Sequence, residues 1–155
     1  MRKLSVPSET ELEVRRRVVG TWKLVATEET LKSGGTRPFP QFGPHGKGFL
    51  MYQADGYMCV VLEDPDRAKW DDPVRATHGE KVASADGTFA YGGRYEIDAE
   101  RRQIVHLPEI ATADGYVGSR QVRPYQFEGE RLIFADVEKA DTDVASWKIV
   151  WERAH

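Results

Sequence analysis

The chain has 155 residues, of which 40% are hydrophobic and 30% are charged, and its net charge is −3. This length and composition predict one folded domain with its own core and exclude a disordered chain. The 22 basic and 25 acidic residues are mixed along the chain, so nothing favours nucleic acid or an anionic membrane as a partner.

The cysteine content and the first residues bear on the compartment. Cys59 is the only cysteine, which excludes an intrachain disulfide and a cysteine-based metal site. Because it lies in the apolar run from Tyr57 to Leu62, we expect a buried and unreactive thiol. Segment 1–12 lacks the apolar stretch of a signal peptide, and no run approaches the roughly 18 apolar residues of a membrane helix. We therefore expect a cytoplasmic protein.

A short helix is predicted near the N-terminus. Ser8 and Glu11 have the spacing of a capping box, and Gly20 favours a helix end. Leu12 and Val19 fall on one stripe at helical spacing, which we interpret as the buried face.

From residue 20 onwards the hydrophobic period changes to two. Trp22, Leu24 and Ala26 alternate with polar residues, which predicts a half-buried strand. A loop rich in glycine and proline follows over 33–48. The Asp55-Gly56 pair between two apolar runs then predicts a β-hairpin.

Further along, Thr77 and Glu80 form a second capping box, which predicts a short helix over 78–86. The expected strands are 20–31, 49–53, 57–63, 91–98, 103–110, 118–127, 131–137 and 145–153. Sequential strands tend to pair, and eight in a meander can close without a free edge. The sequence thus predicts an all-β protein, an eight-stranded antiparallel up-and-down β-barrel over 20–155, with a helical extension over 1–19 packed on it.

The two ends of this barrel resemble those of lipocalins, members of the calycin group. Gly20-Thr21-Trp22 matches the Gly-x-Trp that opens the first lipocalin strand. The last strand ends Val150-Trp151-Glu152-Arg153, and the resemblance implies that Arg153 packs near Trp22 as a structural pair. A cation–π contact, worth about 0.5–2 kcal/mol, gives this pair a physical reason.

More specifically, the chain resembles the bacterial and fungal lipocalin-like domain family, short proteins often found near small-molecule biosynthesis. The matching pieces are 48–52 with 55–58, 90–96, Val105-His106, 117–118 with 121–125, and 128–132. Where the family often has a second histidine after the position of His106, this chain has Leu107, followed by Pro108. The family has no single assigned reaction, so the resemblance implies the fold and a role near secondary metabolism more than an activity.

No metal or cofactor site is predicted. The four histidines (His45, His78, His106 and His155) are far apart, and the acidic residues over 63–72 lack the spacing of a calcium loop. Phosphate-loop and nucleophile-elbow motifs are missing as well.

Polar side chains on the expected strands are the candidates for chemistry in a pocket. His106 could act as a general acid or base, or be hydrogen-bonded within the barrel wall. Arg123, on one face with Gln121 and Tyr125, could clamp a ligand carboxylate or polarise a carbonyl, or lie on the surface. Glu28 and Glu109 are the nearest acidic partners by strand position.

Aromatic residues complete the candidate pocket. Tyr52, Tyr57, Tyr91 and Tyr95 combine an apolar ring with a hydroxyl, which suits a flat or polycyclic ligand, although each could be core. A glycine between the last two leaves room for a ligand or a bend. The loop carrying Phe39, Phe42 and His45 could cover an open end of the barrel.

These residues leave three hypotheses for function. The first, which needs the fewest assumptions, is binding of a small, largely apolar or aromatic molecule inside the barrel. The second is a cofactor-free enzyme (a cyclase, isomerase or dehydratase) that uses His106 and Arg123 as catalytic residues. The third is a structural or dimerisation module with a filled barrel. The expected partner is a small molecule and neither a nucleic acid nor a membrane, and a homodimer stays open.

Overall fold

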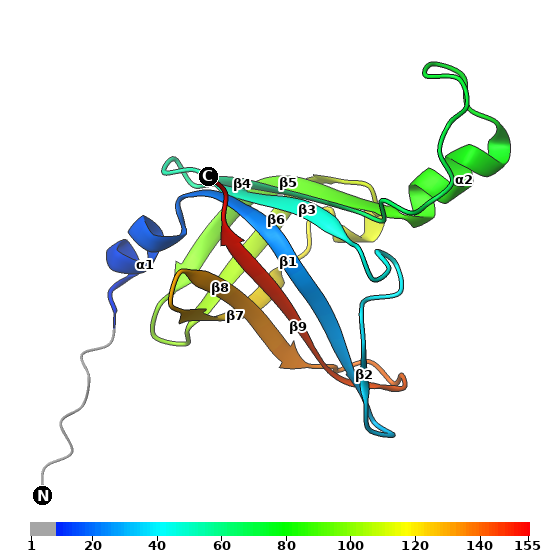
Figure 1. The fold of residues 1–155 in the computed structure, drawn as a ribbon. Helices are drawn as coiled ribbons and strands as arrows, with labels where there is room; N and C mark the ends of the chain where they lie inside the picture. The colour runs from blue at the N-terminus through cyan, green and yellow to red at the C-terminus, as the bar shows by residue number, and fades with distance from the viewer. Residues whose placement is uncertain (1–8) are drawn as a thin grey trace, which may run out of the picture.

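Nine strands form one antiparallel sheet, and eight of them close into a barrel (Figure 1). The computed structural model describes residues 9–155. The strands pair in chain order, and the sheet closes because the first strand also pairs with the last. The element bounds are α1 Glu11–Val18, β1 Gly20–Leu31, β2 Thr36–Arg37, β3 Lys47–Tyr52, β4 Tyr57–Glu63, α2 His78–Asp86, β5 Thr88–Asp98, β6 Gln103–Ala111, the 3₁₀ helix η1 Asp114–Tyr116, β7 Gln121–Glu128, β8 Arg131–Val137 and β9 Val144–Arg153.

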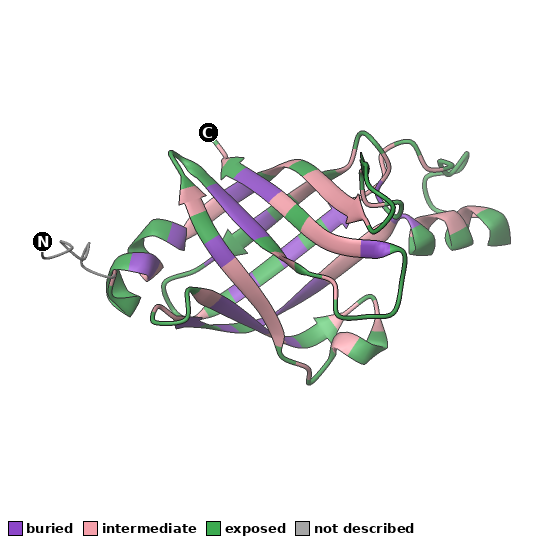
Figure 2. Cartoon of the chain, turned by 90° about the horizontal axis from the view of Figure 1, so that it is seen from below, coloured by how far each residue is buried: buried purple, intermediate pink, exposed green. Residues whose placement is uncertain are grey.

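This architecture confirms the predicted barrel and its two short helices. The two-residue β2 pairs only with the end of β1 and is not part of the closed set. The largest differences in bounds are three residues: β5 starts earlier than predicted, at Thr88, and β7 starts later, at Gln121, because η1 and a turn at Gly118 with φ of 78° come first. Along the strands, buried and exposed residues alternate, so that one face forms the core and the other meets solvent (Figure 2).

A β-bulge in β1 changes which side chains point inward. Leu24 pairs with Trp151 and Ala26 pairs with the adjacent Val150, so Val25 is an extra residue in β1. An extra residue reverses the alternation beyond it. The prediction that Ala26 shares the buried face with Leu24 is therefore wrong, and Ala26 is exposed.

A second irregularity lies between β5 and β6. Gly93 pairs with Pro108, and the register shifts between Gly92 and Gly93. A Cβ atom on Gly93 would lie 2.2 Å from the carbonyl oxygen of Leu107, so only glycine allows this close approach of the two strands. Pro108, which cannot donate to the ladder, lies at this distortion.

Helix α1 begins two residues later than the sequence pattern indicates. Thr10 is the N-cap and forms a capping box with Glu13, whereas Ser8 lies outside the described residues. The buried side chains are Val14 and Val18, and the predicted stripe through Leu12 is wrong, because Leu12 is 56% exposed.

Trp22 and Arg153 join α1 to the barrel. The Arg153 guanidinium lies 4.0 Å from the centre of the Trp22 ring and donates hydrogen bonds to the carbonyls of Arg17 and Val19 at the end of the helix. Gly20 has a φ of 128°, and a Cβ atom there would lie 2.5 Å from the Arg153 Nη1 atom. The glycine that opens β1 therefore makes room for the arginine that ends β9.

On β4, alternate residues point outward, and Cys59 is one of them. Met58, Val60 and Leu62 are buried, while Cys59 is exposed. The expectation of a buried thiol is therefore wrong. The run is apolar on both faces, so hydrophobicity did not distinguish the inner face from the outer one.

Helix α2 projects from the barrel at the end opposite α1 (Figure 1). It has the predicted bounds and the predicted capping box between Thr77 and Glu80. Within residues 9–155, neither α-helix is long and apolar enough to cross a membrane.

Candidate functional site

Two adjoining cavities occupy the barrel at the end away from α1. The inner cavity, which we call the chamber, has a volume of about 170 Å³ and is lined mostly by apolar side chains. The outer one, the vestibule, has a volume of about 490 Å³. Phe39, Tyr116, Arg123 and Ile149 line both, so they form the neck between the two.

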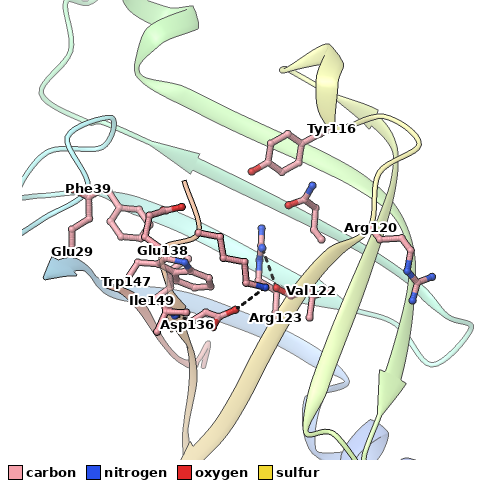
Figure 3. Close-up of a pocket in the computed structure, with 13 residues that line it drawn as sticks. Glu29, Phe39, Tyr116, Arg120, Val122, Arg123, Asp136, Glu138, Trp147 and Ile149 are labelled. Carbon is pink, nitrogen blue, oxygen red and sulfur yellow. Dashed lines mark hydrogen bonds and ion pairs between the residues drawn. The ribbon is translucent and has the colours of Figure 1, made fainter. Parts of the chain in front are cut away.

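The walls of the two cavities differ in polarity. Figure 3 shows the vestibule, with Phe39, Trp147 and Ile149 on one side and Tyr116 and Arg120 on the other. Several of its side chains carry charge, whereas the chamber has one charged side chain, Arg123, among those that line it. The remaining chamber residues are Gln41, Phe42, Leu50, Val60, Leu62, Phe89, Tyr91, His106, Phe134 and Trp151.

His106, on β6, lies between two tyrosine hydroxyls. Its Nε2 atom is 2.5 Å from the Tyr52 hydroxyl, and its Nδ1 atom is 2.6 Å from the Tyr91 hydroxyl. His106 is 1% exposed, and Tyr52 and Tyr91 are also buried. Tyr91 lines the chamber on β5, whereas Tyr52 on β3 lies behind the histidine.

The direction of the protons in this network follows from what each hydroxyl can reach. Tyr52 has no hydrogen-bond partner among the described residues besides His106. If it accepted a hydrogen bond from Nε2–H, its own hydroxyl proton would be buried without an acceptor, at a cost of about 1–3 kcal/mol. Tyr52 therefore donates to Nε2 of a neutral imidazole, and Nδ1–H donates to the Tyr91 oxygen.

The hydroxyl proton of Tyr91 then remains free. None of the residues 9–155 accepts it, and Tyr91 lines the chamber. The network from Tyr52 through His106 to Tyr91, which we call the relay, thus makes Tyr91 a hydrogen-bond donor toward the chamber.

Burial determines the protonation states of the relay. It lowers the pKa of His106 well below its ordinary value, and the positive charge of Arg123 lowers that pKa further. Burial also raises the pKa values of Tyr52 and Tyr91, and Arg123 opposes both increases. Near neutral pH the imidazole is therefore uncharged and both tyrosines keep their protons.

Arg123, on β7, is half-buried at the neck and forms no ion pair with a described carboxylate. It donates a long hydrogen bond of 3.4 Å to the carbonyl of Val122, and its guanidinium lies 5.7 Å from the centre of the Trp147 ring. The three vestibule carboxylates have other partners: Glu29 pairs with Arg37 at 2.8 Å, Asp136 pairs with Lys139 at 4.0 Å, and Glu138 accepts a hydrogen bond of 2.9 Å from the backbone N–H of Ala140. Arg123 is therefore available to a ligand.

Trp151, on β9, supplies an unsatisfied donor in the chamber wall. Its indole Nε1 is buried and has no hydrogen-bond partner within the described residues. A buried donor without a partner is unusual in a folded protein and can indicate a place for a bound molecule or a water.

The structure brings only some of the sequence candidates to the cavities. His106, Arg123 and Tyr91 line the chamber, and Gln121 lines the vestibule. Tyr52 reaches the chamber only through His106.

Two tyrosine candidates lie at the end of the barrel closed by α1. Tyr95 donates a hydrogen bond to the carbonyl of Gln53, and the guanidinium of Arg15 lies over its ring. Tyr125 packs against Phe127. Neither lines the chamber or the vestibule, and both belong to the hydrophobic core.

Three candidates lie on the outer surface, and their assignment to the pocket is corrected. Tyr57 is exposed beside Arg94, and Glu109 is also exposed. Glu28 forms an ion pair with Lys148 on the outside, at 3.7 Å. The neighbouring Glu29 lines the vestibule instead, because the bulge in β1 shifts the alternation by one residue.

Several lining residues were missed by sequence reasoning. Trp147, Ile149 and Trp151 alternate along β9 and all face the cavities, a period of two that the sequence displays. Tyr116 lies in η1, between two strands, and no periodic pattern indicates its position.

The loop between β2 and β3, a candidate cover for an open end of the barrel, contributes two aromatic side chains to the cavity walls. Phe39 and Phe42 line the chamber. His45 points away and its Nδ1 atom lies 2.6 Å from a carboxylate oxygen of Asp66 on the surface.

Metal-binding side chains do not gather in the described part of the chain: no group of three His, Cys, Asp or Glu residues there could hold an ion.

Comparison with protein families finds a model, described as a lipocalin-like domain, which matches residues 19–154. Comparisons with curated proteins and with solved structures yield no significant match.

Proposed function

Because the chain belongs to the lipocalin-like domain family, we propose that its barrel binds one small, largely apolar or aromatic molecule. The observation that carries this proposal is the chamber of about 170 Å³, enclosed by aromatic and aliphatic side chains inside a closed barrel. Small-molecule sites are typically concave and mostly apolar, with a few polar groups that fix the ligand's orientation. The chamber suits a single ring, and the vestibule leaves space for a larger substituent.

Arg123 is the group that orients the ligand in this proposal. It lies at the neck between the chamber and the vestibule and has no carboxylate partner among the described residues. A guanidinium that loses part of its hydration is stabilised by an oxygen acceptor. A carbonyl or carboxylate of the ligand supplies one.

Native mass spectrometry of the purified protein, followed by a thermal-shift screen of aromatic and fatty acids, tests this function. Ligand binding to the folded state raises the melting temperature. The variant Val60→Phe fills the chamber and should abolish the shift, while Val61→Phe, on the outer face of the same strand, should keep it. Each shift is measured against the same variant without ligand, because overpacking itself costs about 1–3 kcal/mol.

The two variants decide between the chamber and other sites. An equal shift in Val60→Phe would show that the ligand binds elsewhere. No bound mass and no shift for any compound would favour a structural module.

The second candidate is a cofactor-free enzyme, such as an isomerase, cyclase or dehydratase of small-molecule biosynthesis. The relay favours it, because a buried histidine is linked to a tyrosine hydroxyl in the chamber wall. Both ring nitrogens of His106 are occupied by tyrosines, so Tyr91 is the group that would exchange a proton with a substrate. Mass spectrometry of the bound compound after incubation in deuterated water distinguishes a catalyst, which exchanges or converts its ligand, from a binder.

We further propose a cytoplasmic location and a homodimer. An exposed, unpaired cysteine suits a reducing compartment. The dimer is supported by an apolar patch on the outer face of β3 to β6, where Phe49, Met51, Val61 and Ile110 are exposed.

A further inference from the structure

The chamber wall is rich in hydrogen-bond donors. Tyr91 presents a hydroxyl proton that the relay leaves free, Arg123 presents a guanidinium, and Trp151 has an unsatisfied indole N–H. Among residues 9–155, no carboxylate lines the chamber, and Gln41 is the one amide side chain that does. A wall of this kind has no carboxylate to pair with a ligand cation and has several donors for a ligand oxygen.

The distribution of charge also favours a ligand oxygen over a ligand cation. His106 is neutral because it is buried near Arg123, so the guanidinium is the local positive charge. On its chamber side the guanidinium meets largely apolar side chains, and in such surroundings charge-assisted hydrogen bonds to an anion are stronger than in water. The relay adds a donor whose orientation is determined before any ligand arrives.

We propose that the chamber binds the anionic oxygen of a ring-bearing ligand, such as a phenolate or an enolate, with Tyr91 and Arg123 as its donors. Tyr52 and His106 act as positioning residues, because they keep the Tyr91 proton directed toward the ligand. This inference rests on the proposed small-molecule binding and adds the chemistry of the ligand to it. In a binding protein the relay has this positioning role even when the ligand is not converted.

Titration with 4-nitrophenol tests the proposal. The probe has a single ring, and its phenolate absorbs in the visible range while the neutral phenol does not. If the chamber prefers the anion, the bound probe ionises at a lower pH than the free probe, and a tenfold preference corresponds to one pH unit. Nitrobenzene, which has the same nitro-substituted ring without the hydroxyl, measures binding without the phenolate oxygen.

Two variants examine the donors. Tyr91→Phe should weaken binding of the nitrophenolate about tenfold or more and leave nitrobenzene binding unchanged. Tyr52→Phe, which removes the group that determines the proton direction, should reduce the shift in probe ionisation while keeping the affinity for nitrobenzene. Tyr57→Phe, on the outer face, is the matched control and should change neither.

The outcomes separate this proposal from the proposed function. If nitrobenzene binds and 4-nitrophenol shows no lowered ionisation, the chamber binds small molecules but is not an oxyanion site. Equal nitrophenolate binding by Tyr91→Phe and the wild type would overturn the role of the relay. If neither probe binds to the wild-type protein, the proposed function itself fails for single-ring ligands.

Discussion

At the scale of single residues, the relay is the feature that most needs a physical explanation. A buried histidine between two buried tyrosines places three titratable groups inside a β-barrel, which a filled core would not require. The cost of burying them is offset only if every proton has an acceptor. The described residues provide acceptors for all but the Tyr91 proton, and that proton points toward the chamber.

This burial predicts how stability depends on pH. The pKa of His106 is lowered in the folded state, so below its ordinary value of about 6.5 the unfolded chain takes up a proton that the folded chain does not. The stability that the protein keeps while His106 is neutral in both states is therefore fully present above about pH 6.5. It is lost as the pH falls toward the pKa of His106 in the folded state. The free energy of unfolding should fall by up to about 1.4 kcal/mol per pH unit in that window.

Urea denaturation between pH 7 and pH 5 measures this dependence. His106→Gln, which keeps a side chain able to bond both tyrosines, should flatten the profile. His78→Gln changes an exposed histidine at the start of α2 and should preserve the wild-type slope. A wild-type profile that is flat over this range would mean that His106 is not held neutral.

At the scale of elements, α1 closes the end of the barrel opposite the vestibule (Figure 1). The carbonyl of Val18 accepts a hydrogen bond of 2.8 Å from the Trp22 indole, and Arg153 binds carbonyls at the same helix end. Arg15 and Arg17 extend over the rings of Tyr95 and Phe127. The helix thus contributes to the same core as the strands, although its sequence is rich in charge.

The buried face of α1 should therefore matter for stability. Val18→Ala removes a fully buried side chain and should lower the free energy of unfolding by about 2 kcal/mol. Leu12→Ala, on the exposed side of the helix, should change it by less than about 0.5 kcal/mol. Thermal or urea denaturation compares the two, and equal losses would show that the helix does not pack as described.

The elements were largely predictable because most of their signals are local. Capping at Thr77, the Asp55-Gly56 turn and the period of two each depend on a few neighbouring residues. The orientation of side chains was less predictable. It depends on the bulge at Val25, which no residue type in the sequence predicts. In β4 both faces are apolar, so the pattern does not indicate which face is buried.

The site was predictable to the same extent. His106 was a candidate because it lies in the apolar run 104–107 and matches the family's histidine position. Arg123 was a candidate because it shares a strand face with Gln121 and Tyr125. Glu28 was misplaced because one extra residue in β1 exchanges it with Glu29. The contact between His106 and its two tyrosines joins three different strands, and such a contact depends on the register of the whole barrel.

At the scale of the whole molecule, the outer surface of the barrel is uneven. The strands β3 to β6 carry cross-strand rows of apolar residues on their outer face: Phe49, Val61 and Ala90 in one, and Met51, Cys59, Gly92 and Ile110 in the other. Ile110 is 73% exposed. No charged residue interrupts either row, and contiguous apolar surface of this kind marks an interaction site.

We propose a second copy of the chain as the partner that covers this patch. A two-fold axis between the two sheets, perpendicular to the strands, reverses the strand direction in the partner. The apolar rows of the two copies then meet each other. Arg94, beside Tyr57, lies at one end of the patch, and Lys47 lies opposite Glu63 at the other end, so the charged residues stay at the rim of the contact.

The dimer should be detectable through Cys59, which lies within the patch and is the only cysteine of the chain. Light scattering should give the mass of two chains, and a short bifunctional thiol reagent should join them covalently, because the interface brings both thiols together. Val61→Lys, which buries a charge in the interface, should yield a monomer that no longer crosslinks, while Val82→Lys on the exposed face of α2 should leave the dimer intact. A wild-type protein that scatters as a monomer at high concentration would exclude this interface, and the patch would then need a different partner to cover it.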